Sequence, residues 1–362
     1  MILISARRTW LCALLVLALT ASCSAKPGPA RTPDPSRAAV PGHPSPAASP
    51  GPGRAHVKVR VAARFRVPIA SSGPAVVIGD DLWIAFLREP IKRFQATMNP
   101  GHLVDLDTRT GHVRRVLEIG SLPSGIVASG HHIWIPTIPG DLHPPDRQRD
   151  IVTELDRNGS IIRRYHVHDP EAITPAKNGV WVTSFTGRDG TSLHHLHDGR
   201  ADPAIPLQDA VGGGRTVLAE CPDGLYTATT DIGTVTVTRF SHTGTNPHSV
   251  RLDAAGYAEL ACTDHGVVAI TSDTITRITA RGKATQTTRP PGPIAGAAVT
   301  PGKIWLLTSP EKNHRSTLTA VDPRTGTPAE PRSIPAAASI TADGTDLWTT
   351  SADGRVFKIE TH

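Results

Sequence analysis

The 362-residue chain is poor in charged and aromatic residues, and it has only four cysteines. Charged residues make up 19% of the chain, against 32 Gly and 33 Pro, a balance that is typical of a turn-dense β protein and argues against a helical bundle. A membrane-spanning helix is not indicated, because the apolar run at residues 10–19 is too short to cross a bilayer. These features predict an all-β protein.

The formal net charge of +6 does not by itself indicate a nucleic-acid-binding protein. Six of the 38 Lys and Arg residues, but only one of the 32 Asp and Glu residues, lie before position 55, so residues 55–362 carry about +1. This part of the chain has no basic stripe and no RNA-binding aromatic motif. We therefore expect no nucleic-acid partner.

The N-terminal segment has the pattern of a secretory signal: Arg7 and Arg8 precede the apolar run, and LTASC follows at residues 19–23. This sequence resembles the lipobox of bacterial lipoproteins, although Thr20 stands where Leu is commonest. The resemblance implies removal of residues 1–22, acylation of Cys23 and a lipid anchor on the extracellular side of the cell membrane. The alternative is an ordinary secretory signal with an unrelated cysteine.

Residues 24–54 contain nine Pro, six Ala and four Gly without apolar periodicity, so we expect them to form an extended tether. The predicted organisation is a signal peptide at 1–22, the lipidated cysteine and tether at 23–54, and a folded domain at 55–362.

The folded domain consists of repeats. Seven segments show a short apolar strand, a turn rich in Gly, Asp or Asn, and then an apolar residue that usually precedes an aromatic one. The aromatic position recurs at intervals of 37 to 51 residues, close to the roughly 40 to 50 residues of a four-stranded propeller blade. It is occupied by Trp83, Trp134, Trp181, Tyr226, Val268, Trp305 and Trp348.

A second pair of alternating strands follows most of these motifs, joined by Thr-Gly, Asn-Gly or Arg-Gly turns. Each unit is therefore expected to form four antiparallel strands, a to d, and the whole a seven-bladed β-propeller. The seventh unit ends at residues 356–362 with strand c. We predict that residues 57–67 supply its strand d and close the ring.

The repeats resemble those of the virginiamycin B lyase-like and quinoprotein-like (PQQ-like) propellers, most closely in ITPAKNGVWVTS from residue 173 and SITADGTDLWTT from residue 339. The lyase resemblance implies a metal ion and a His/Glu set on the inner face. The residues that follow the aromatics here supply no carboxylate. Because the aromatics are needed for blade packing, we also predict no quinone or other cofactor. A propeller scaffold hosts many functions, so the resemblance indicates fold more than activity.

Two cysteines remain for the folded domain. Cys221 and Cys262 lie near the ends of strand a in adjacent units, in an oxidising compartment if the chain is secreted. We predict a disulfide between them. Two buried free thiols are the alternative, and no motif supports a catalytic cysteine.

The densest histidine cluster is His194, His195 and His197. His195 and His197 share a face of the predicted strand c, as two metal ligands would require. They replace Asp105 and Asp107 of the first unit, which we interpret as solvated polar positions. A surface role is therefore predicted, with no metal site. His131 and His132 of a tight a–b turn are interpreted in the same way.

Long connections between short strands are the best candidates for ligand contact. The first two b–c loops, at residues 87–102 and 137–150, are the longest, and solvated decoration is the alternative interpretation. The candidate ligand-binding residues in these two loops are Arg88, Lys92, Arg93, His143, Asp146 and Arg147. Arg188 of the third b–c loop, Glu171 and Tyr257 are further candidates.

These observations predict a monomeric, surface-anchored module that binds a protein, glycan or small molecule. The alternative is an extracellular lyase or hydrolase, with or without a metal ion. Such an enzyme would need His143, Asp146, Glu171 or Glu259 to converge on the channel mouth.

Overall fold

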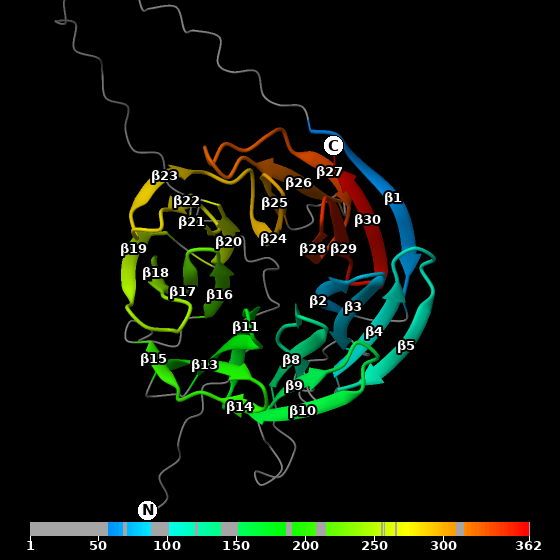
Figure 1. Cartoon of the computed structure of the whole chain (residues 1–362). Helices are drawn as coiled ribbons and strands as arrows, with labels where there is room; N and C mark the ends of the chain where they lie inside the picture. Colours follow the sequence, from blue (N-terminus) through cyan, green and yellow to red (C-terminus); the bar gives the residue numbers. More distant parts are fainter. Residues whose placement is uncertain are drawn as a thin grey trace, which may run out of the picture. The chain divides into compact units, whose positions relative to one another are not determined.

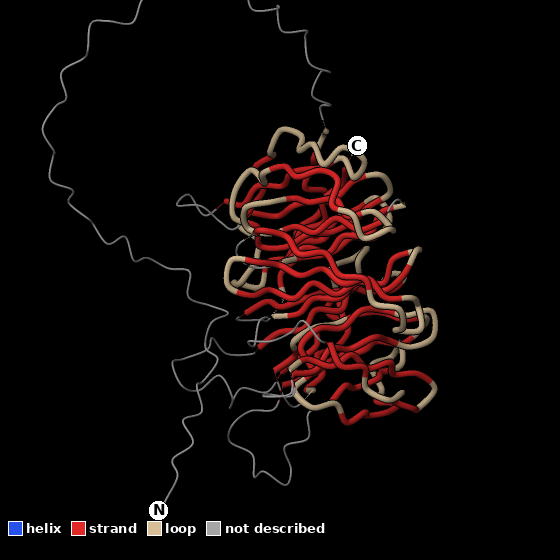
Figure 2. Tube along the Cα trace, turned by 90° about the vertical axis from the view of Figure 1, so that its left-hand side faces the viewer, coloured by secondary structure: helices blue, strands red, loops and turns tan. Residues whose placement is uncertain are grey.

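A computed structural model describes residues 57–67, 71–87, 101–119, 122–138, 151–185, 190–207, 215–254, 256, 258–264, 266–308 and 315–361. Within these ranges the fold is all-β, and no helix is long and apolar enough to cross a membrane. Seven antiparallel sheets form a ring, as the repeats predict (Figure 1). Figure 2 shows the ring from the side, with turns at both edges of the strands.

The first three blades are described from the inner to the outer strand. Blade 1 consists of β2 (Ser71–Ile78), β3 (Asp81–Leu87), β4 (Gly101–Asp107) and β5 (Val113–Glu118). Blade 2 has an inner strand in two pieces, β6 (Leu122–Pro123) and β7 (Val127–Ser129), then β8 (His132–Ile138), β9 (Ile151–Leu155) and β10 (Ile161–His166). Blade 3 consists of β11 (Pro170–Pro175), β12 (Val180–Phe185), β13 (Thr191–His197), and an outer strand in two pieces, β14 (Arg200–Ala201) and β15 (Ile205–Leu207).

The next three blades are regular. Blade 4 consists of β16 (Thr216–Cys221), β17 (Gly224–Asp231), β18 (Thr234–Phe240) and β19 (His248–Asp253). Blade 5 consists of β20 (Glu259–Thr263), β21 (Gly266–Ile270), β22 (Ile275–Ile278) and β23 (Ala284–Thr288). Blade 6 consists of β24 (Ile294–Thr300), β25 (Lys303–Thr308), β26 (Arg315–Val321) and β27 (Arg332–Pro335).

Blade 7 joins the two ends of the propeller. Its strands β28 (Ser339–Asp343), β29 (Asp346–Thr350) and β30 (Arg355–Thr361) come from the end of the chain, and its outer strand is β1 (Val59–Arg66). β1 pairs with β30 in antiparallel register from Val59 opposite Thr361 to Arg66 opposite Arg355. The predicted closure of the ring by the N-terminal strand is confirmed, as Figure 1 shows at the position marked C.

The aromatic position of the repeat lies on the second strand of each blade and is buried in all seven, with at most 3% of any of these residues exposed. Its side chains fill the spaces between neighbouring blades. Trp83 of blade 1 packs with Ile126 and Ile133 of blade 2, and Trp348 of blade 7 packs with Leu82 of blade 1. The expectation that these residues pack blades together is therefore confirmed.

The c–d turns bring backbone against these aromatics. Gly159 lies in the c–d turn of blade 2 at a φ of 78°, and a Cβ added there would lie 3.1 Å from the Trp83 ring and 2.4 Å from a Leu117 carbon. Gly244 of blade 4 has the same relation to Trp181 of blade 3. Glycine is needed at these turns both for the positive φ and for the close approach.

The interpretation of Asp105 and Asp107 as solvated positions is wrong. Asp105 is 1% exposed and Asp107 is 7% exposed, because strand c is covered by strand d and by the next blade. Asp105 pairs with Arg115 of β5 at 3.0 Å, and burial raises the pKa of its carboxyl despite this partner. Asp107 accepts hydrogen bonds from the backbone of Thr110 at 2.7 Å and Arg109 at 3.0 Å, and the Thr110 bond holds its pKa below the usual range.

Candidate functional site

The predicted loop residues lie at the expected connections but outside the described residues. β3 ends at Leu87 and β4 begins at Gly101, while β8 ends at Ile138 and β9 begins at Ile151, so both long b–c connections are present in the topology. Nothing further is described for Arg88, Lys92, Arg93, His143, Asp146, Arg147, Arg188 and Tyr257, nor for Cys23. Their roles stay predictions.

The predicted disulfide joins Cys221 and Cys262, whose Cα atoms are 5.2 Å apart. Cys221 is the last residue of β16 and Cys262 lies in β20, so the bond links the inner strands of blades 4 and 5. Both cysteines lie in the apolar cluster between these blades. Their role is therefore structural.

Glu171 is the one predicted ligand residue that the structure describes. It lies at an irregularity in β11, the inner strand of blade 3, between Pro170 and Ala172. Burial raises the pKa of its carboxyl to about 7, and the nearby Asp169 adds to the increase. Among the described residues, its Oε2 atom is buried without a hydrogen-bond partner. A carboxyl with this pKa can both accept and release a proton near neutral pH.

The antiparallel pairing divides the ring into two faces. We call the side that carries the a–b and c–d turns the turn face; the b–c connections lie on the other side. Glu171 and Glu259 stand at the starts of the inner strands β11 and β20, so they lie toward the b–c side. His143 and Asp146 lie outside the described residues, so their predicted convergence with Glu171 and Glu259 on the channel mouth stays a prediction.

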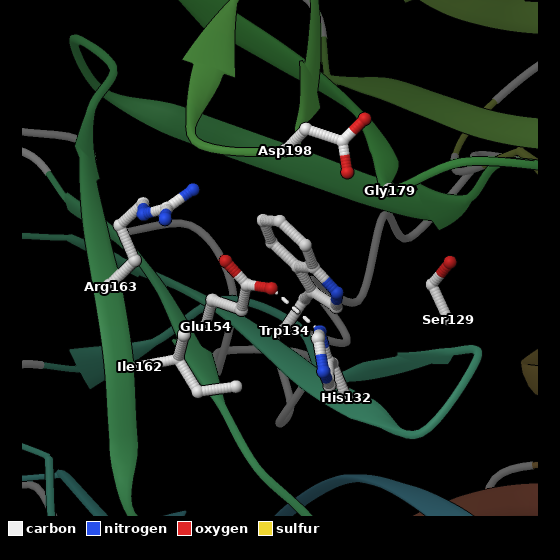
Figure 3. A pocket seen from close by; sticks show the side chains of 8 residues that line it. All are labelled: Ser129, His132, Trp134, Glu154, Ile162, Arg163, Gly179 and Asp198. Atoms are coloured by element: carbon white, nitrogen blue, oxygen red, sulfur yellow. Dashed lines mark hydrogen bonds and ion pairs between the residues drawn. The ribbon is translucent and has the colours of Figure 1, made fainter.

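A cavity of about 360 Å³ opens on the turn face between blades 2 and 3. Its residues come from the a–b and c–d turns and from the neighbouring ends of strands a, b, c and d (Figure 3). In the view of Figure 3 the Trp134 ring lies between the His132–Glu154 pair and Asp198. The lining residues are Ser129, His132, Trp134, Glu154, Ile162, Arg163, Gly179 and Asp198.

Glu154 organises one wall of this cavity. Its Oε1 atom lies 2.6 Å from Nδ1 of His132, and its Oε2 accepts a hydrogen bond of 3.0 Å from the hydroxyl of Tyr165. The same hydroxyl accepts a hydrogen bond of 3.1 Å from the backbone of Gly199 in blade 3, so this network connects the two blades. Burial is the main cause that raises the pKa of Tyr165.

This network was not predicted from the sequence. His132 was interpreted as an ordinary turn residue, and Glu154 and Tyr165 were not singled out. The available signal was register: Glu154 stands directly opposite Trp134 on the neighbouring strand, at a position that the repeat places between blades. A carboxylate there is buried, and it requires partners to compensate for lost hydration.

The histidine cluster lies next to the cavity, on the c–d hairpin of blade 3. His195 stacks on Trp181 with ring centroids 4.5 Å apart, and His197 stacks on His195 at 4.6 Å. Asp202 approaches both imidazoles: its Oδ2 lies 3.0 Å from Nδ1 of His195, and its Oδ1 lies 3.2 Å from Nε2 of His197. Asp198, which lines the cavity, lies 3.5 Å from Nδ1 of His197.

The electrostatics of this cluster are dominated by Asp202. Its hydrogen bond is the main cause that raises the pKa of His197, and the pKa of Asp202 is lowered in turn. The side chains of His195 and His197 are 19% and 25% exposed, so they are partly covered rather than freely solvated. The shared face of the two histidines was predicted from the sequence, whereas the part played by Asp202 was not.

The chain matches no family model and no curated protein. Solved structures do resemble it. Virginiamycin B lyase from Staphylococcus aureus aligns with a TM-score of 0.61 and 14% identity, over 84% of this chain and 99% of the lyase. A catalytically inactive form of the same lyase with quinupristin aligns with a TM-score of 0.59 and 15% identity, over 84% and 99%.

BamB from Moraxella catarrhalis aligns with a TM-score of 0.53 and 15% identity, over 84% of this chain and all of BamB. At these identities the similarity establishes the propeller fold. It agrees with the expected resemblance to lyase-like and quinoprotein-like propellers.

Proposed function

We propose that this chain is a lipid-anchored binding module on the extracellular side of the cell membrane, and that its propeller holds a protein partner at the turn face between blades 2 and 3. The LTASC sequence at residues 19–23 supports the anchor. The fold is compatible with a binding module, since one propeller scaffold hosts many unrelated functions.

The observation that carries the proposal is the edge of the cavity. Ile161 and Ile162 are 50% and 44% exposed on β10, the outer strand of blade 2, and Ile162 lines the cavity. Arg163 and Arg164 follow them directly. Ile162 and Arg163 line the cavity together, so an exposed apolar side chain and an arginine lie beside a concave polar surface. Arg is enriched in protein–protein interfaces, whose buried centre is apolar.

The test is a photo-crosslinking amino acid placed at Ile162 in cells that naturally carry the protein. Ile232 is the matched control, because it is 98% exposed and lies in the b–c turn of blade 4 on the opposite side of the ring. We expect a discrete crosslinked species from position 162, its loss on adding Arg163→Glu, and none from position 232. Absence of a species at 162, or the same species from both positions, would contradict the proposal.

A second candidate function, an extracellular lyase or hydrolase, is favoured by Glu171. Its buried, unpartnered Oε2 and a pKa of about 7 suit a general base on the inner strand of blade 3. Mass spectrometry of quinupristin incubated with the parent chain and with Glu171→Gln tests this candidate. Conversion by the parent and not by the variant would support it, and an unchanged compound in both would exclude this substrate.

A further inference from the structure

Three side chains of metal-ligating type converge on the c–d hairpin of blade 3. One donor atom from each of His195, His197 and Asp202 lies within 4.8 Å of the other two. We propose that these residues form a binding site for a divalent transition-metal ion, and that Zn²⁺ is the metal that this donor set fits. The site is separate from the edge formed by Ile161 and Ile162, so it does not depend on the proposed function.

The local sequence places all three donors on one face. Alternation along β13 puts His195 and His197 on the same side of the strand. The hairpin turns at Asp198 and Gly199, which have φ values of 43° and 81°. The returning chain then runs antiparallel, and the backbone N–H of Asp202 donates to the carbonyl oxygen of His195 at 2.9 Å. Asp202 is thus the cross-strand neighbour of His195.

The hydrogen bond of His195 to Asn178 determines which ring nitrogen faces Asp202. Its Nε2 lies 2.8 Å from the carbonyl oxygen of Asn178, which can only accept, so Nε2 carries a proton. In the neutral ring Nδ1 is then a bare lone pair, and it faces Oδ2 of Asp202 at 3.0 Å. Two acceptors at this distance repel each other unless a proton or a metal ion lies between them.

His197 extends the same arrangement. Its Nε2 faces Oδ1 of Asp202 at 3.2 Å, so the carboxylate is positioned between the two imidazoles. A divalent ion bound by Nδ1 of His195, Nε2 of His197 and Asp202 converts these facing lone pairs into ligand bonds. The N–H of His195 that donates to Asn178 then has the role that an outer hydrogen bond has in metal sites, which is to fix the tautomer and orientation of the ligating ring.

The rings are held in place before any ion binds. The stack of Trp181, His195 and His197 restricts both imidazoles, and the indole is itself buried between blades. Asp202 has a side chain that is 48% exposed, so the ion has access from solvent and can retain a water ligand. Bonds of about 2.0 to 2.1 Å in tetrahedral geometry place Zn²⁺ ligands roughly 3.4 Å apart. The two distances from Asp202 to the imidazoles, 3.0 and 3.2 Å, are near this value.

The donor chemistry selects the class of metal. Imidazole nitrogen with one carboxylate suits Zn²⁺ and its neighbours in the first transition row, whereas Mg²⁺ and Ca²⁺ favour sites made of oxygen ligands. An arrangement of two histidines and one carboxylate with an open position also occurs in zinc enzymes. The site adjoins the cavity through Asp198, which contacts His197 and lines the cavity wall.

The test is calorimetric titration of the purified, metal-stripped chain with ZnCl₂. The variants are His197→Ala and Asp202→Asn, the second of which keeps the shape of the side chain. The matched control is His242→Ala. His242 also faces a carboxylate, Glu220 at 3.1 Å, and a backbone carbonyl, Pro222 at 3.3 Å, but its hydrogen-bond partners among the described residues include no second imidazole.

We expect one saturable Zn²⁺ site in the parent and in His242→Ala, weakened at least tenfold in both cluster variants, and no comparable binding of Mg²⁺. Circular dichroism of each variant establishes that it is folded. Co²⁺ should give an intense visible absorption in the parent, typical of four-coordination, that is lost in Asp202→Asn. No saturable Zn²⁺ site, or equal affinity in all four proteins, would overturn the proposal and leave the cluster as an ion-paired ring stack.

Discussion

Replacing Trp83 by alanine tests whether the repeat has been assigned correctly. Trp83 is fully buried between blades 1 and 2, where it packs with Leu103 of its own blade and with Ile133 and Leu155 of the next. Its Nε1 atom has no hydrogen-bond partner among the described residues, so its contribution comes from packing. We expect Trp83→Ala to lower the free energy of unfolding by about 3 to 5 kcal/mol.

Blade 5 supplies the matched control, because Val268 occupies the equivalent position and is 1% exposed. Val268→Ala removes far less apolar surface, and we expect a loss of about 2 kcal/mol from the lost transfer free energy and the small cavity. The ratio of the two effects thus follows from side-chain size at one structural position.

The assay is equilibrium urea unfolding together with thermal melts of the parent and both variants. At about 2 °C per kcal/mol for a large domain, Trp83→Ala should lower the melting temperature by roughly 6 to 10 °C and Val268→Ala by roughly 4 °C. A Trp83→Ala protein that melts within about 2 °C of the parent, or a larger effect for Val268→Ala, would refute the packing role and the equivalence of the blades.

Four further outcomes are expected. Labelled palmitate should be incorporated into the parent but not into Cys23→Ala, which should also be released from the membrane; retention of that variant would contradict the anchor. Deleting residues 57–66 should destabilise the whole ring in urea, since β30 loses its partner strand; unchanged unfolding would contradict closure. Replacing Cys221 and Cys262 by serine should cost about 2 to 4 kcal/mol; linked peptides in a non-reduced digest check the bond itself. The pKa of Glu171 is raised from 4.5 to about 7 in the folded state, so its contribution to stability is fully present below pH 4.5 and is lost as pH rises through 7. Unfolding measured from pH 5 to pH 8 should therefore show a fall of up to about 3 kcal/mol that Glu171→Gln lacks; equal slopes would contradict the burial of this carboxyl.

The sequence predicts the fold well because the information is periodic. An apolar residue, usually Trp, recurs on the second strand of each blade because every blade must pack against its neighbour at this position. A Gly-containing hairpin follows it in most blades. Closure follows from the same logic, since a seventh unit without a strand d leaves β30 with an unpaired edge that β1 fills. The disulfide follows because Cys221 and Cys262 occupy similar levels of adjacent inner strands.

Burial of polar groups on strand c was not predictable by alternation. Asp105 belongs to a strand whose residues alternate in type, and alternation assigns its polar face to solvent. In a propeller the second face of each sheet packs against the next blade, so Asp105 is buried together with its partner Arg115. The same effect conceals Glu154, whose partners His132 and Tyr165 come from two other strands.

Asp105, Glu154 and His195 occupy the same position of the repeat: each lies on the third strand of its blade, directly opposite the aromatic residue of the second strand. In five blades the residue there is charged. In four of them a partner in the same blade compensates it: Asp105 by Arg115, Glu154 by Tyr165, Arg239 by Asp223 and Lys358 by Asp346. In blade 5, Arg277 instead donates a hydrogen bond to the carbonyl oxygen of Arg324 in blade 6. Blade 3 has His195 at this position, with Asp202 on one side and a second imidazole stacked on the other. In blade 2 the carboxylate has the partners His132 and Tyr165, whereas in blade 3 His195 is grouped with two further side chains of metal-ligating type, His197 and Asp202. Since packing alone does not require His197, the departure of blade 3 from the repeat marks the place where this propeller differs in chemistry from its other blades.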